Sequence, residues 1–172
     1  MAPLSMLRIG LAAIGLAAVL PQGGPAGATS PASEPIAIAV FDLDYLDTSG
    51  EVQDQQKEHA ARLQRFAAGL RQDLAGSGKY RIVYPACDSA SCTAAGSDAS
   101  VLVDSARQAG AKLVIFGGVH KMSTLVQWAK LQALDLESDK IVFDKLITFR
   151  GDNDESWRQA ESFVAREFIA TP

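Results

Sequence analysis

Three aspartates occur within six residues, directly after the first strongly apolar segment of the chain, at Asp42, Asp44 and Asp47. Carboxylate oxygens bind hard cations such as Ca²⁺, and they also accept backbone N–H bonds in turns. A calcium loop of the EF-hand type needs an acceptor at its fifth position and Gly at its sixth, where this chain has Leu46 and Asp47. The preferred interpretation is therefore a turn, in which a following hydroxyl side chain helps to start a helix.

Both histidines, His59 and His120, lack a His, Cys or Glu neighbour at metal-ligand spacing. Each is expected to be structural or to face solvent. His120 follows a predicted strand parallel to the first one, and ligands of open α/β sheets bind beyond the carboxyl ends of such strands. An edge formed by Asp42, Asp44, Asp47 and His120 is therefore the alternative candidate for a small-ligand or metal site. The preferred interpretation assigns no metal and no cofactor.

No catalytic constellation is recognisable. The chain has no Gly-x-Ser-x-Gly nucleophile elbow. A hydrolase built on the aspartates at the strand end is the weakest hypothesis, because neither a positioned nucleophile nor a paired acid and base can be identified. We predict no catalytic residues and a protein that is not an enzyme.

The only two cysteines, Cys87 and Cys92, lie in one segment rich in Ser, Ala and Asp. A redox pair normally has two intervening residues and opens a helix, so the spacing favours a structural disulfide. Closing so short a loop stabilises the fold by roughly 2 kcal/mol in the chain-entropy model.

The first 28 residues have the pattern of an export signal. Arg8 precedes the apolar run 9–20, and Ala26-Gly27-Ala28 supplies the small side chains required for cleavage. The run is too short to span a bilayer, no later apolar stretch reaches that length, and no cysteine near the cut supports a lipid anchor. We expect a signal peptide at 1–28, a polar leader at 29–35, one globular domain at 36–172, and a soluble, non-lipidated periplasmic protein.

Charge excludes some partners. Of 16 basic and 20 acidic residues, the signal contains only Arg8, so the remainder carries a net charge of −5. Nucleic acids and anionic membranes favour clustered positive charge, which argues against both as partners. Membrane insertion after signal cleavage is not expected.

The pattern of apolar residues predicts an α/β (α+β) domain with one mixed sheet of about five strands and three helices, in the order β-α-β-α-β-β-β-α. The predicted strands are 36–41, 80–84, 112–119, 125–135 and 140–150. The predicted helices are 54–75, a segment from a Ser97 cap to Gly110, and a last one capped by Asp152 or Asn153. The final two strands form a hairpin.

Both faces of that hairpin are more apolar than a one-sided antiparallel pair needs. One set of alternating side chains includes Trp128, Leu134, Val142 and Leu146, interleaved with Lys130 and Asp144. The other set includes Leu125, Leu131, Ile141, Phe143 and Ile147. Either helices cover both sets, or one set forms an exposed interaction surface.

Three segments resemble an uncharacterised exported bacterial family, a domain of unknown function near the TolB amino-terminal and CsgG-type envelope domains. These segments are 36–44 together with 47–49, 109–121, and 149–158, of which the run Arg-Gly-Asp-Asn-Asp-Glu-Ser-Trp is the most specific. The resemblance implies an envelope protein that assembles with other proteins, and it transfers no catalytic residue. Without a lipidated cysteine, an outer-membrane pore is not expected.

Taken together, these observations predict a periplasmic, non-catalytic binding or envelope accessory protein with an envelope protein as partner. A periplasmic small-ligand or metal-binding protein is the alternative. The sequence does not specify the oligomeric state.

Overall fold

The computed structural model describes residues 34–87 and 92–171. The expected signal peptide and nearly all of the polar leader lie outside the described residues. Within the described part, nine elements follow the chain. The strands are β1 (Ile36–Val40), β2 (Asp44–Asp47), β3 (Tyr80–Ile82), β4 (Leu113–Lys121), β5 (Val126–Asp135) and β6 (Lys140–Arg150). The helices are α1 (Gln56–Gly76), α2 (Ala99–Gln108) and α3 (Asp154–Ala170).

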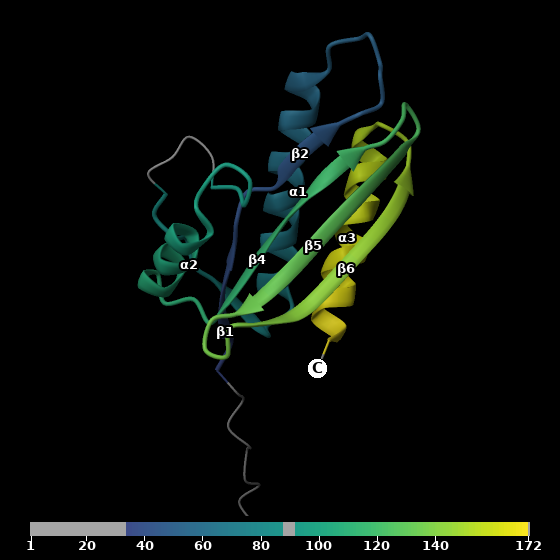
Figure 1. Cartoon of the computed structure of the whole chain (residues 1–172). Coiled ribbons are helices and arrows are strands. Elements are labelled where there is room, and N and C mark those ends of the chain that lie inside the picture. Colours follow the sequence, from purple (N-terminus) through teal and green to yellow (C-terminus); the bar gives the residue numbers. More distant parts are fainter. Residues whose placement is uncertain (1–33, 88–91, 172) are drawn as a thin grey trace, which may run out of the picture. The chain divides into compact units, whose positions relative to one another are not determined.

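All six strands form one mixed sheet (Figure 1). Five of them follow the order β3-β1-β4-β5-β6, and β2 pairs with β4 beside this path. β1 is parallel to β3 and β4, while β4, β5 and β6 are antiparallel neighbours, as the sequence predicts. The α+β class and the order of the other elements are confirmed.

β2 corrects one expectation, because the sequence predicts a turn at Asp42, Asp44 and Asp47. Residues 44–47 instead pair in parallel with 118–121 of β4, beyond the part of β4 that pairs with β1. Gly118 permits this close approach: a Cβ there would lie 2.7 Å from the carbonyl oxygen of Asp44. β4 therefore extends two residues beyond the predicted end at Val119, and His120 lies inside the strand rather than after it.

α1 and α3 pack side by side on one face of the sheet (Figure 1). The apolar side of α1 is buried there, with Phe66, Leu70 and Leu74 nearly inaccessible. α3 contributes Trp157, Val164 and Phe168 to the same core. The last helix thus covers the face that α1 covers, and it leaves the opposite face of the hairpin open.

α2 packs on the other face, over β1 and the first half of β4. Asp98 caps this helix by accepting the N–H of Ser100 at 2.8 Å, one residue after the predicted cap at Ser97. Asn153, one of two predicted caps of α3, accepts the N–H of Ser156 at 2.9 Å. Cys87 and Cys92 are joined in a disulfide and pack against the small core beneath α2.

Candidate functional site

The four side chains of the predicted edge lie near β2 but have separate partners. Asp42 is mostly exposed and lies 3.4 Å from Nη2 of Arg71 on α1. Asp44 accepts the backbone N–H of Ala95 at 3.1 Å, which ties β2 to the segment before α2. Each of these two aspartates therefore fixes a loop or helix to the sheet.

Asp47 and His120 lie on opposite faces of the sheet. β2 places Asp47 opposite Lys121 and Leu46 opposite His120, and neighbouring residues of a strand point to opposite faces. His120 Nε2 shares a hydrogen bond with Thr48 Oγ1 at 2.8 Å. Burial opposes ionisation of Asp47, but hydrogen bonds from Ser49 and the charge of Lys121 hold the pKa of its carboxyl below the ordinary range.

The four side chains of the predicted edge therefore do not converge on one ligand or metal ion. Across residues 34–87 and 92–171, no group of three or more His, Cys, Asp and Glu side chains could hold a metal ion. Asp44 and His120 are on the same face, whereas Asp47 belongs to the helix-covered side.

The densest polar cluster lies on that helix-covered side and was not foreseen from the sequence. Its centre is Lys121, which is wholly buried. Lys121 Nζ donates to Glu51 Oε2 at 2.5 Å and to Gln55 Oε1 at 2.7 Å, and it lies 2.8 Å from Asp152 Oδ2. Burial alone would lower the pKa of Lys121, but hydrogen bonds to Asp152 and Glu51 raise it above the ordinary value.

Asp152 is the shared acceptor of this cluster. Its Oδ2 is also 2.8 Å from His59 Nε2, and its Oδ1 accepts from Arg62 at 2.6 Å and from Gln127 at 3.3 Å. Burial opposes the charge, yet the hydrogen bonds from Lys121 and His59 lower the pKa of Asp152. The sequence offered Asp152 only as a possible helix cap, a role that Asn153 fills.

Aromatic rings pack against the polar cluster on the side that faces the hydrophobic core. His59 is almost fully buried and stacks on Tyr45, with ring centroids 4.7 Å apart, and Trp157 lies beyond it. Burial, with the nearby charges of Asp47 and Asp152, raises the pKa of Tyr45. The phenol therefore stays neutral at physiological pH.

The buried cluster links three segments of the chain through its ion pairs. It connects the start of α1, the end of β4 and the segment before α3, and its charged atoms are paired with one another. Breaking a buried ion pair by removal of one partner typically costs 3–5 kcal/mol, roughly, because the remaining charge is left uncompensated. The cluster holds β2 and the end of β4 in place, which in turn shapes the other face of the sheet.

That other face is open over β2, β5 and β6, and it carries large apolar side chains. We call it the outer face. Its apolar residues and their exposed fractions are Leu46 54%, Trp128 38%, Val142 45% and Leu146 54%. His120 lies edge-on to the Trp128 ring, with centroids 6.1 Å apart. Lys130 and Asp144 form an ion pair on the same face, and Gln132 donates to Asp144 at 2.9 Å.

The alternation predicted for the hairpin is observed except at Ile141. This residue is expected with Phe143 and Ile147, but a register shift pairs it with Leu134 and so places it on the opposite face, where it is 46% exposed. Trp128, Val142 and Leu146 belong to the outer face, whereas Leu131, Phe143 and Ile147 face α1 and α3. Leu134 lies on the same face as Trp128, as expected, but there it is partly buried against the core beneath α2.

This combination of fold and surface defines an α+β domain with helices on both faces of a mixed sheet and one part of that sheet uncovered. The chain belongs to the family DUF3280, described as a protein of unknown function (DUF2380), which matches residues 36–169. The expected membership in a family of unknown function is confirmed. No curated protein sequence matches the chain.

Several solved structures are similar to this chain at low identity. TolB from Acinetobacter baumannii is 17% identical with a TM-score of 0.49, over 80% of this chain and 28% of that chain. The LpoB C-terminal domain from Salmonella enterica is 16% identical with a TM-score of 0.43, over 69% of this chain and 84% of that chain. Lipoprotein GNA1162 from Neisseria meningitidis is 18% identical with a TM-score of 0.44, over 80% of this chain and 99% of that chain. This chain thus spans less than a third of the TolB chain.

In the described part of the chain, no helix combines the length and the apolar character that crossing a bilayer requires.

Proposed function

We propose that this protein is an exported, periplasmic and non-catalytic accessory protein that binds an envelope protein through its outer face. The observation that carries the proposal is the exposure of Leu46, Trp128 and Leu146 on one face of the sheet, over β2, β5 and β6. An antiparallel sheet with one solvated face normally alternates apolar and polar side chains. Exposed apolar side chains gathered on one face are typical of protein interaction sites.

Trp128 has the properties of an anchor residue. Its ring lies edge-on to His120 and is 38% exposed, so part of it is already packed and part is free for a partner. Tryptophan is enriched among residues whose truncation costs most binding energy, because a large rigid ring buries much area at a small entropic cost. Trp128 lies on a strand that is paired on both sides, so binding requires no new secondary structure at this surface.

Charge on the outer face suits a protein partner better than an anionic polymer. Lys130 is neutralised by Asp144, and the chain has a net charge of −4. An apolar protein surface with few unpaired charges is the complementary partner. DNA, RNA and anionic lipid would need a basic patch.

The absence of catalysis is supported by how the polar groups are used. Lys121 and Asp152 would be the strongest candidates for acid–base work, but they are paired with each other. Glu51 and Gln55, just before α1, occupy Lys121, and His59 and Arg62 of α1 occupy Asp152. A general acid or base must reach a substrate proton, directly or through one water. Lys121 is closed off from solvent and holds three elements together.

The experiment compares partner recovery by three variants. Trp128→Glu and Leu146→Glu place a charge on the outer face, and Val52→Glu places the same charge at a fully exposed loop residue. Cross-linked partners of each tagged variant are recovered from the periplasm of the native host and quantified by mass spectrometry. The proposal expects the same envelope proteins to be lost from the two outer-face variants and retained by Val52→Glu.

Thermal unfolding of the same variants separates binding from folding. Equal melting temperatures with loss of the partner support the outer face as the contact surface. Retention of every partner by correctly folded Trp128→Glu and Leu146→Glu contradicts the proposal. If Trp128→Glu unfolds, Leu146→Glu decides, because its side chain is more exposed.

A further inference from the structure

β6 is a long strand at an open edge of the sheet. It has 11 residues and pairs with β5, and no other strand of the described part pairs with it. Every second residue of an edge strand directs its N–H and C=O away from the sheet, where they match the backbone of another extended strand. The opposite edge, β3, has only 3 residues.

Natural edge strands are usually protected by Pro, by a short length, by unpaired charges or by a covering segment. β6 contains neither Pro nor Gly, and its one register shift lies at residues 141–143, before the segment 144–150. Its two central charged residues are paired within the chain and so do not protect the edge. Asp144 pairs with Lys130, and Lys145 pairs with Glu167 of α3 at 2.5 Å. Figure 1 shows β6 at the border of the sheet, with α3 beneath its face rather than across its edge.

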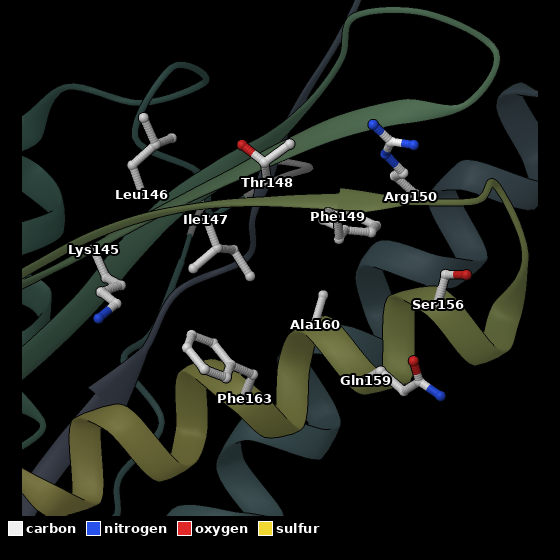
Figure 2. Close-up of a pocket in the computed structure, with 10 residues that line it drawn as sticks. All are labelled: Lys145, Leu146, Ile147, Thr148, Phe149, Arg150, Ser156, Gln159, Ala160 and Phe163. Atoms are coloured by element: carbon white, nitrogen blue, oxygen red, sulfur yellow. The ribbon is translucent and has the colours of Figure 1, made fainter.

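A groove of about 490 Å³ runs between β6 and α3. Figure 2 shows Ile147 and Phe149 pointing from β6 toward α3, where Ala160 and Phe163 form the other wall. Phe163 is 40% exposed. A strand added beside β6 would place every second side chain in this groove, which gives those side chains an apolar environment.

We propose that the occupant of this edge is β6 of a second copy of this chain, antiparallel and centred on Ile147. In this register Asp144 lies opposite Arg150 of the second copy, and the same pair occurs twice because of the two-fold symmetry. Opposed residues of an antiparallel pair share a face, so both pairs lie on the outer face. The sheet then continues through both copies with α3 of each on the same side.

Charge selects this register. Arg150 is exposed and, within the described residues, has neither an ion pair nor a hydrogen bond from its side chain. Asp144 keeps 47% of its side chain exposed beside Lys130, so its carboxylate can accept a second cation. A dimer centred on Lys145 would instead oppose Lys145 to itself and Lys140 to Arg150, which is repulsive.

The remaining opposed pairs are also compatible. Leu146 meets Thr148 on the outer face, and Ile147 meets itself above the groove. Lys145 meets Phe149, and this lysine already lies 5.7 Å from the centre of the Phe163 ring. A lysine stem against an aromatic ring is a favourable contact for both its apolar and its charged part.

The dimer does not depend on the outer face binding a partner. Leu146 belongs to both surfaces, so Trp128→Glu, on β5 and outside the paired strand, distinguishes the outer face from the dimer. If both hold, the two outer faces lie side by side on one surface, and a partner would meet Trp128 from both copies.

The first test is the oligomeric state of the purified protein without its export signal, by sedimentation equilibrium. Arg150→Glu turns both opposite-charge pairs into like-charge pairs and is expected to weaken dimerisation about tenfold or more. Asp144→Lys in the Arg150→Glu background restores the attraction and is expected to recover the dimer. Arg81→Glu makes the same charge change at an exposed position of β3, at the opposite edge, and should leave the dimer unchanged.

The second test fixes the register. Ile147→Cys should form a disulfide between copies under oxidation, because directly opposed residues have Cβ atoms close to the separation that a disulfide needs. Val142→Cys lies outside the paired residues and should not cross-link. If the purified protein is a monomer at its highest soluble concentration, the proposed dimer is wrong. The dimer is also wrong if β6 of a monomeric protein binds an added peptide but not a second copy. A dimer that is insensitive to Arg150→Glu and does not cross-link through Ile147→Cys also overturns it.

Discussion

Lys121 and Asp152 form a buried ion pair with 2.8 Å between Nζ and Oδ2, linking the end of β4 to the segment before α3. The two residues are far apart in the sequence and carry no motif that would pair them. The same carboxylate also receives His59 and Arg62 from α1. Asp152 therefore connects the end of β4, the segment before α3 and the start of α1 on the helix-covered face.

Replacing Asp152 by alanine should destabilise the fold by about 3–5 kcal/mol, because Lys121, His59 and Arg62 would lose their common acceptor in a buried site. The free energy of unfolding from urea titration measures this effect. Asp154→Ala is the matched control, since Asp154 is 68% exposed and pairs with Arg62 and Arg65 at the surface. Its cost should stay within about 1 kcal/mol. Equal costs for the two variants would contradict the role of Asp152.

Glu161 gives the protein a pH-dependent stability. Only 5% of this residue is exposed, and its Oε1 has no hydrogen-bond partner among the described residues. Burial, reinforced by the charge of Asp73, raises the pKa of Glu161 from 4.5 to about 7. Gly69 of α1 makes room for it, because a Cβ there would lie 2.9 Å from Glu161 Oε2.

The folded pKa is the higher one, so the protonated carboxyl contributes stability that is complete below pH 4.5 and is lost as the pH rises to about 7. Glu161→Gln should remove this loss and stabilise the protein above pH 7 by about 1–3 kcal/mol. Urea titrations of both proteins at several pH values between 4 and 8 measure the difference. If the two curves run parallel across that window, Glu161 does not titrate as described.

The disulfide between Cys87 and Cys92 should leave no free thiol in the oxidised protein. Thiol labelling after denaturation without reductant is expected to detect none, and labelling after reduction should detect two. The Cys87→Ser, Cys92→Ser double variant should lose roughly 2 kcal/mol of stability, because the closed loop is short. Two reactive thiols before reduction would contradict the pairing.

Calorimetric titration with calcium, magnesium or manganese should give little heat. Asp42 lies beside Arg71 and Asp44 accepts a backbone N–H, while Asp47 is on the opposite face from His120. Micromolar binding that Asp44→Ala abolishes would favour the alternative function as a ligand or metal-binding protein. Asp139→Ala, at an exposed turn away from β2, is the control for that result.

The sequence by itself determined the elements whose patterns are local. The apolar spacing of α1, the caps before α2 and α3 within one residue, and the alternation in β5 and β6 each depend on residues within a few positions of one another. The disulfide between Cys87 and Cys92 was predictable because the chain has only these two cysteines. The division of hairpin side chains into two faces follows from the strand period of two, except at Ile141, where a register shift that no local pattern indicates changes its face.

Only the tertiary structure decided which face each helix covers and where the charged residues lie. β2 has the sequence Asp-Tyr-Leu-Asp, too short and too polar to predict a strand, and it exists because β4 supplies hydrogen-bonding partners beyond β1. The residue type of Lys121 predicts a surface position. It is buried instead, because Glu51, Gln55 and Asp152 contact it from distant segments of the chain. A lysine is tolerated inside a protein only when its charge is paired, and no local pattern encodes partners that folding alone brings together.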